Sequence, residues 1–130
     1  MKKTPQDVRI LLVEDDPLII QIYKTRFSQE GFQVDVADTG EKAVEMAREN
    51  PYDLIVLDIV LPYLTGFEVL ERLRSFEETK NTKVIMFTNL NSQEDIERAR
   101  ELGVEEFMVK AYFTPTEVVE KIKKILGLQQ

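Results

Sequence analysis

The sequence predicts an α/β fold: an open, doubly wound parallel sheet of five strands with five helices. Two observations carry this prediction. Five short apolar runs recur along the 130 residues, and the segments between them show helical periodicity and helix-capping residues. Three of these runs are apolar without alternation, as in strands buried on both faces of a sheet. The runs are ILLV (10–13), VDVA (34–37), LIVL (54–57), VIMF (84–87) and FMV (107–109).

The second run differs from the others because Asp35 interrupts it, which indicates a strand at the edge of the sheet. Connections between consecutive parallel strands are almost always right-handed. With the second strand at an edge, this rule favours the strand order 2-1-3-4-5.

The first helix has a clear start and end. Asp16 is a typical N-cap residue, and Pro17 after it suits the first helical position. Ile20, Tyr23 and Phe27 then form one face. Gly31 can close the helix in the left-handed conformation.

The second and third helices follow the same logic. Residues 38–41, DTGE, begin the second helix, which must end near Asn50 because the residue before Pro51 disfavours the helical conformation. The apolar face of the third helix is marked by Phe67, Leu70 and Leu73.

The last two helices are each predicted to begin with a capping box, Ser92 with Asp95 and Thr114 with Glu117. The fifth helix then carries an apolar stripe of Val118, Ile122, Ile125 and Leu126. The fourth is mostly charged, and its thin stripe is Ile96, Ala99 and Leu102. Two interpretations stay open for it: an ordinary solvated helix, or a weakly anchored element that can shift.

Composition excludes several function classes. The chain has no cysteine and no histidine, so it holds no disulfide, no thiolate metal site and no phosphohistidine. A net charge of −7 without a basic run argues against direct nucleic-acid binding. No apolar run is long enough for a signal peptide or a membrane span. We therefore expect a cytoplasmic protein without membrane insertion.

Polar side chains end four of the predicted strands. Glu14 and Asp15 follow the first strand, Asp58 the third, Thr88 the fourth and Lys110 the fifth. The carboxyl ends of parallel strands line one crevice, so these groups should converge there. Neighbouring carboxylates are costly unless a cation lies among them, and Mg²⁺ prefers oxygen ligands. A carboxylate nucleophile, a metal and two donors are the parts needed to accept a phosphoryl group.

The chain resembles the receiver domain of two-component response regulators over nearly its whole length. The segments that carry the resemblance are LLVEDDP, DLIVLDIVLPYLTGFEVL, VIMFTN and FMVK. Taken alone, each acidic turn or strand-end residue is a weak signal, and only the ordered set is specific. The resemblance implies a flavodoxin-like fold of the chemotaxis-regulator type and a single receiver domain over residues 1–130, with its core at about 8–127.

The resemblance also implies roles for the strand-end residues. Asp58 corresponds to the phosphoacceptor. Asp15 corresponds to a direct Mg²⁺ ligand, Glu14 to a residue that acts mainly through water, and the carbonyl of Val60 to a further metal ligand. Lys110 corresponds to the lysine that bridges to the phosphoryl group.

Further positions match the family's switch and its loop. Thr88 corresponds to the switch hydroxyl and Phe107 to a rotating aromatic residue, although a packing role for Phe107 is nearly as plausible. Pro62 and Gly66 match the residues that shape the loop after the phosphorylation site. Asp16 is expected to be a helix cap and not a ligand.

The implied function is a phosphorylation-controlled interaction module and not an enzyme. Its partners would be a histidine kinase or histidine phosphotransfer protein and a downstream protein. The downstream partner would bind the face formed by the fourth helix, the fifth strand and the fifth helix. Because the sequence ends at Gln130 soon after that helix, output by protein contact is expected.

Three other functions fit the sequence less well. An aspartyl phosphatase would need an Asp-x-Asp motif after the first strand, which VEDDP lacks. A flavin-carrying protein would need a hydroxyl- and glycine-rich phosphate loop where this chain has three acids. The runner-up is a degenerate receiver that is no longer phosphorylated, and only Asn89 and Ala111 support it.

Those two residues depart from the family pattern. Ala111 stands where proline is usual after the lysine, and a cis bond before a non-proline residue costs about 3 kcal/mol, so a trans Lys110–Ala111 bond is predicted. Asn89 replaces a small residue and can crowd the site. Tyr63 and Leu64 are bulky where the loop is often small, which suits either partner recognition or packing.

The side chains two residues after Asp58 and Thr88 are Val60 and Leu90. They flank the place that an attacking water would occupy, and neither can orient water. The hypothesis that follows is a long-lived phosphorylated state.

Overall fold

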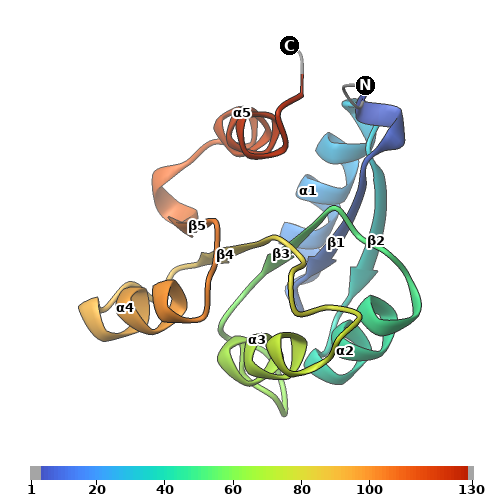
Figure 1. Cartoon of the computed structure of the whole chain (residues 1–130). Helices are drawn as coiled ribbons and strands as arrows, with labels where there is room; N and C mark the ends of the chain where they lie inside the picture. Colours follow the sequence, from blue (N-terminus) through green and yellow to red (C-terminus); the bar gives the residue numbers. More distant parts are fainter. Residues whose placement is uncertain (1–3, 129–130) are drawn as a thin grey trace.

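The computed structural model describes residues 4–128. Its five parallel strands are in the order β2-β1-β3-β4-β5, which confirms the predicted fold class and strand order (Figure 1). The strands are β1 (Arg9–Val13), β2 (Gln33–Ala37), β3 (Leu54–Leu57), β4 (Val84–Thr88) and β5 (Glu106–Val109). The helices are α1 (Pro17–Gln29), α2 (Gly40–Glu49), α3 (Gly66–Ser75), α4 (Gln93–Glu101) and α5 (Pro115–Leu126). Two short 3₁₀ turns, η1 (Pro5–Asp7) and η2 (Lys110–Tyr112), were not predicted.

Helices cover both faces of the sheet. Helices α1 and α5 lie on one face, and α2, α3 and α4 lie on the other (Figure 1). Successive side chains of a strand point to opposite faces, so Ile10 and Leu12 of β1 join the cluster under α1 and α5, whereas Leu11 and Val13 join the other cluster. Every residue of β3 and β4 is buried. The edge strand β2 is only partly buried, as Asp35 indicated.

The predicted helix ends are largely confirmed. The Asp16 carboxylate accepts a hydrogen bond from the N–H of Leu18 at 2.9 Å, so Asp16 is the N-cap of α1. Gly31, after the end of α1, has a φ of +96°. The capping box of α5 forms as predicted, and α3 has a further box, Thr65 with Glu68, that was not predicted.

The predicted capping box of α4 is only half formed. The Ser92 hydroxyl accepts from the N–H of Asp95 at 3.1 Å, but within residues 4–128 no reciprocal bond joins the Asp95 carboxylate to the N–H of Ser92. Asp95 is one methylene shorter than Glu117, which closes the corresponding box in α5. The prediction of a full box at this position was therefore wrong.

The charged helix α4 is held chiefly at its C-terminal end. Ala99 is its one fully buried residue. Beyond that end, the guanidinium of Arg74 in α3 donates to the carbonyls of Leu102 (2.8 Å) and Gly103 (3.2 Å). The same guanidinium donates to two carbonyls of the α3–β4 loop, at 2.8 and 3.2 Å. Arg74 thus ties the two turns at this end of the sheet to each other.

Among the described residues, no helix combines the length and apolar character that crossing a membrane requires.

Candidate functional site

The predicted site residues converge at the carboxyl edge of the sheet. Val13 is paired with Leu57 in the β1–β3 register, so Glu14 and Asp58 leave neighbouring strands at the same level. Thr88 is the last residue of β4, and Lys110 follows β5 directly. The predicted convergence is confirmed for the three acids and the lysine by the distances below.

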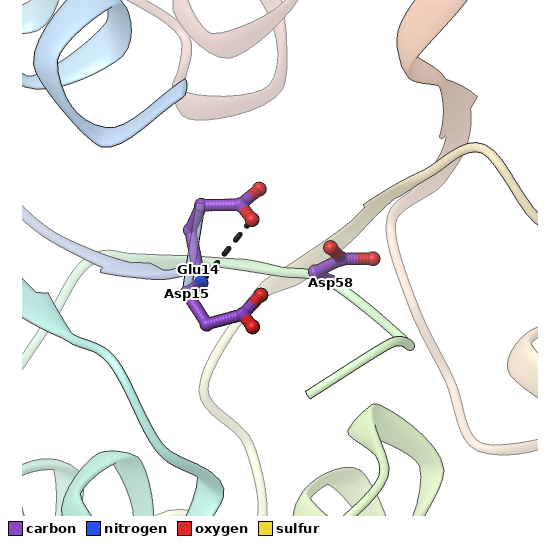
Figure 2. A group of neighbouring side chains, drawn as sticks. All are labelled: Glu14, Asp15 and Asp58. Carbon is purple, nitrogen blue, oxygen red and sulfur yellow. Dashed lines mark hydrogen bonds between the residues drawn. The ribbon is translucent and has the colours of Figure 1, made fainter. Parts of the chain in front are cut away.

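Three carboxylates form the acidic part of the site. Each of Glu14, Asp15 and Asp58 offers an oxygen, and these oxygens lie within 4.8 Å of one another. Figure 2 shows Glu14 and Asp15 side by side at the end of β1, with the Asp15 carboxylate facing Asp58. Glu14 and Asp58 are buried, with 1% and 6% of their surface exposed, whereas Asp15 is exposed. Of the three carboxylates, Asp15 is therefore the one that solvent reaches most easily.

Both oxygens of the Glu14 carboxylate already have partners. One accepts from the ammonium of Lys110. The other accepts from the backbone N–H groups of Asp15 and Asp16, each at 3.2 Å. Burial raises the pKa of Glu14, an effect that the Lys110 ammonium opposes without cancelling it. A glutamate engaged in this way has little capacity left for a direct metal bond.

Lys110 joins the two buried acids. Its ammonium donates to Glu14 and, at 2.8 Å, to Oδ2 of Asp58, and only 13% of its side chain is exposed. Burial lowers the pKa of Lys110, but the hydrogen bonds and charges of Asp58 and Glu14 outweigh burial, so the pKa is raised above its ordinary value. The lysine is therefore a fixed cation within the site.

The Asp58 segment is held from both sides. Its Oδ1 accepts from the N–H of Val60 at 3.2 Å. Behind it, a Cβ added to Gly66 would lie 2.1 Å from the Asp58 carbonyl oxygen and 2.7 Å from Cα of Ile59. Only glycine permits this approach of α3 to the backbone, and the N–H of Gly66 donates to the Ile59 carbonyl at 2.8 Å.

The hydroxyl of Thr88 is fully buried and accepts a hydrogen bond from the N–H of Leu90 at 3.3 Å. This bond, which the sequence did not predict, folds the start of the β4–α4 loop over the end of β4. Phe107 is half-buried and packs against the core cluster under α2, α3 and α4. It also lines a groove with Ile96 of α4 and Val104.

The two departures from the family pattern contact each other. No cis peptide bond occurs in residues 4–128, so the prediction of a trans Lys110–Ala111 bond is confirmed. The N–H of Ala111 donates to Oδ1 of Asn89 at 3.0 Å. The Asn89 side chain is therefore engaged with the β5–α5 connection, a role that its position in the sequence did not reveal.

Exposed apolar and aromatic side chains lie on the loops that follow β3, β4 and β5. Val60 is 56% exposed and Leu90 44%, and the two tyrosines of the neighbouring loops, Tyr63 and Tyr112, are 91% and 69% exposed. Tyr63 has a φ of +70°, which is uncommon for a residue with a side chain. Leu64, by contrast, is buried. Packing therefore accounts for Leu64 but not for Tyr63.

The donor set fits a hard divalent cation. Asp15 and Asp58 offer the carboxylate oxygens that Mg²⁺ prefers, and among the three acids the single ammonium of Lys110 offsets only one negative charge. The exposed Asp15 leaves one side of the cluster open to water and to a phosphate oxygen.

Comparison with known proteins agrees with this geometry. The model of the response regulator receiver domain family matches residues 10–123. The transcriptional regulatory protein SrrA of Staphylococcus aureus is 36% identical over 121 residues, which are 93% of this chain and 48% of that protein. The chain thus spans about half the length of the curated relatives it matches.

Solved structures are similar over nearly the whole chain. The non-phosphorylated HemR receiver domain of Leptospira biflexa superposes with a TM-score of 0.85 at 32% identity, covering 95% of this chain and 97% of that one. A receiver domain of a sensor histidine kinase from Pseudomonas aeruginosa, with a magnesium ion coordinated in its active site cleft, gives a TM-score of 0.84 at 28% identity and covers 92% and 98%.

Proposed function

The chain belongs to the response regulator receiver domain family, and on that premise we propose that Asp58 accepts a phosphoryl group from a histidine kinase or a histidine phosphotransfer protein. One observation carries the proposal: a buried carboxylate is bonded to a partly buried lysine and lies among two further acids at the carboxyl edge of the sheet. A structural ion pair would not need a third carboxylate, Asp15, beside the two that bond the Lys110 ammonium.

The proposed reaction is an in-line displacement at phosphorus. An oxygen of Asp58 forms the new P–O bond while the P–N bond of the donor phosphohistidine breaks, and the released imidazole takes up a proton. Lys110 supports this step because its ammonium lies 2.8 Å from Oδ2 of Asp58. From there it would stabilise the negative charge of the phosphoryl group that Asp58 receives. Hydrogen bonds from Lys110 and from the N–H of Val60 hold the two oxygens of Asp58 and so orient the nucleophile.

The proposed metal is Mg²⁺, which when bound neutralises charge on the transferring phosphoryl group. Asp15, Asp58 and the carbonyl of Val60 would hold it directly. Glu14 would act through water, which agrees with the partners that both of its oxygens already have.

The proposed output is a change of the surface formed by α4, β5 and α5. The hydroxyl of Thr88 would donate to a phosphoryl oxygen on Asp58, and a side-chain rotation that brings it there would move its oxygen away from the N–H of Leu90, from which it accepts at 3.3 Å. Release of that bond would loosen the β4–α4 loop, next to a helix with one fully buried residue. Phe107, half-buried between this helix and the core, would adjust with it.

We further propose that residues 1–130 act as one receiver domain with a core at about 8–127. The domain would be a cytoplasmic signalling module and not an enzyme. Its downstream partner would be a protein, without direct nucleic-acid contact through this domain.

The test is intact-mass spectrometry after incubation with acetyl phosphate, with and without Mg²⁺. A Mg²⁺-dependent phosphoryl adduct is expected on the wild type and not on Asp58→Asn. Asp16→Asn is the matched control, because it removes a neighbouring carboxylate but keeps a helix-capping side chain. This variant should be phosphorylated like the wild type.

Some receivers accept phosphoryl groups only from proteins, so beryllofluoride binding supplies a second measurement. A chain that forms no adduct and binds no beryllofluoride in Mg²⁺ would contradict the proposal. The degenerate receiver would then be the better account.

A further inference from the structure

The loops after β4 and β5 are joined by one side-chain hydrogen bond. Thr88 and Val109 are the last paired residues of the β4–β5 register. Beyond them, Oδ1 of Asn89 accepts from the N–H of Ala111 at 3.0 Å. The Asn89 side chain thus continues the pairing past the end of the sheet, where backbone groups no longer meet.

Both residues that make this bond are sequence neighbours of site residues. Asn89 directly follows Thr88, and Ala111 directly follows Lys110. The N–H of Ala111 belongs to the peptide unit that begins at the Lys110 carbonyl carbon. Fixing that N–H fixes the plane of the unit and so restricts the backbone from which the Lys110 side chain extends.

The position of Lys110 matters because one ammonium serves two buried acids. It donates to both Glu14 and Asp58, with only 13% of the side chain exposed. A long side chain that makes both bonds loses rotamer freedom, and this cost falls when its backbone is already held. The 3₁₀ turn η2 that starts at Lys110 has no side-chain cap of its own, so the Asn89 amide provides the support.

We propose that Asn89 is a positioning residue for Lys110, acting through the N–H of Ala111, and that it sets the rate at which Asp58 is phosphorylated. Asn89 and Ala111, the two departures from the family pattern, then depend on each other for one hydrogen bond. Ala111 supplies the N–H that proline in its place would lack, and Asn89 supplies the acceptor. The part of the inference that concerns rate depends on the proposed phosphorylation of Asp58, whereas the part that concerns Lys110 does not.

The first experiment measures position directly, by NMR, without any phosphoryl donor. Asn89→Leu keeps the approximate shape of the side chain and removes the acceptor, whereas Asn89→Asp keeps an acceptor oxygen. Asn91→Leu is the matched control, because Asn91 is an exposed asparagine of the same loop. In Asn89→Leu, exchange of the Ala111 amide should accelerate by about tenfold, and the order parameter of the Lys110 side chain should fall. In Asn89→Asp and Asn91→Leu both should stay as in the wild type.

The second experiment measures the initial rate of phosphorylation by acetyl phosphate in saturating Mg²⁺. Asn89→Leu should be slower by about tenfold, because a small displacement of a group that contacts the reacting atoms is costly. Asn89→Asp should recover most of the rate, and Asn91→Leu should match the wild type.

The outcomes separate the alternatives. If the Ala111 amide exchanges equally fast in the wild type and in Asn89→Leu, the bond is not made in solution and the inference fails. If the amide loses protection while Lys110 order and the rate stay unchanged, the bond is real but does not position Lys110, and the inference also fails. If the wild type accepts no phosphoryl group and binds no beryllofluoride in Mg²⁺, the proposed function fails, and the NMR measurements alone decide whether Asn89 positions Lys110.

Discussion

Replacing Gly66 by alanine tests the close contact between α3 and the backbone of the phosphorylation site. Helix propensity alone predicts a gain from this change, at most about 1 kcal/mol, since Gly66 is the first residue of α3. The structure predicts the opposite sign. The added Cβ would lie 2.1 Å from the Asp58 carbonyl oxygen, where contacts under 3.0 Å essentially never occur.

The expected cost follows from what must move. The obstacle is backbone and not a flexible side chain, so α3 and the Asp58 segment must separate by roughly 1 Å, at an overpacking cost of about 1–3 kcal/mol. The bond from the N–H of Gly66 to the Ile59 carbonyl, 2.8 Å in the wild type, would be weakened, which adds about 1 kcal/mol. The free energy of unfolding should fall by about 3 kcal/mol, and the melting temperature by about 10 °C for a chain of this length.

Urea denaturation followed by circular dichroism measures this change. Gly127→Ala is the comparison variant, because a Cβ there would meet nothing within 4 Å but the residue has a φ of +66°. It should lose only about 1 kcal/mol, for conformational reasons. A Gly66→Ala variant as stable as the wild type would refute the reasoning, because the close contact would then be absorbed without cost.

Three further predictions concern other parts of the chain. Arg74→Met should lower the free energy of unfolding by about 2–3 kcal/mol in urea denaturation, because four backbone carbonyls lose their donor. Arg74→Lys should rescue little, since an ammonium lacks the planar fork. Glu30→Gln should cost up to about 1 kcal/mol at pH 7, where Glu30 pairs with Lys123 at 2.7 Å. The hydrogen bond from Lys123 lowers the pKa of Glu30 below its ordinary 4.5, so this stabilisation is present above about pH 4.5 and is lost as the pH falls through the lowered pKa. If the pair contributes nothing, thermal melts would show a difference in melting temperature between the wild type and Glu30→Gln that stays constant as the pH falls. Finally, the phosphorylated chain should persist for longer than seconds in Mg²⁺ without a phosphatase, since Val60 and Leu90 offer no group that orients water; a radiolabel chase showing loss within seconds would contradict this.

The strands and most helix ends could be predicted because their signals are local. A run such as LIVL at 54–57 is apolar on both faces, and Asp16 before Pro17 marks a helix start, whatever the rest of the chain does. The capping box of Thr65 with Glu68 had the same kind of signal, and its spacing in the sequence would have revealed it.

The site was predictable only in part. The strand-end position of Asp58 and Lys110 follows from topology, but the bond that Lys110 also makes to Glu14 depends on side-chain conformation. The bond between Asn89 and Ala111 joins residues 22 positions apart, and neither residue type signals the other. The positive φ of Tyr63 is likewise a property of the folded loop, since tyrosine does not favour that conformation.

The distribution of tyrosines gives the protein a built-in optical probe. The chain has four tyrosines and no tryptophan, so tyrosine dominates its ultraviolet emission. Tyr23 and Tyr52 are buried, whereas Tyr63 and Tyr112 are exposed on the two loops that follow β3 and β5. A water-soluble quencher would therefore act mainly on light emitted from the edge that holds Asp58. Events at that edge become visible without an added label, while the protected part of the signal reports on the core.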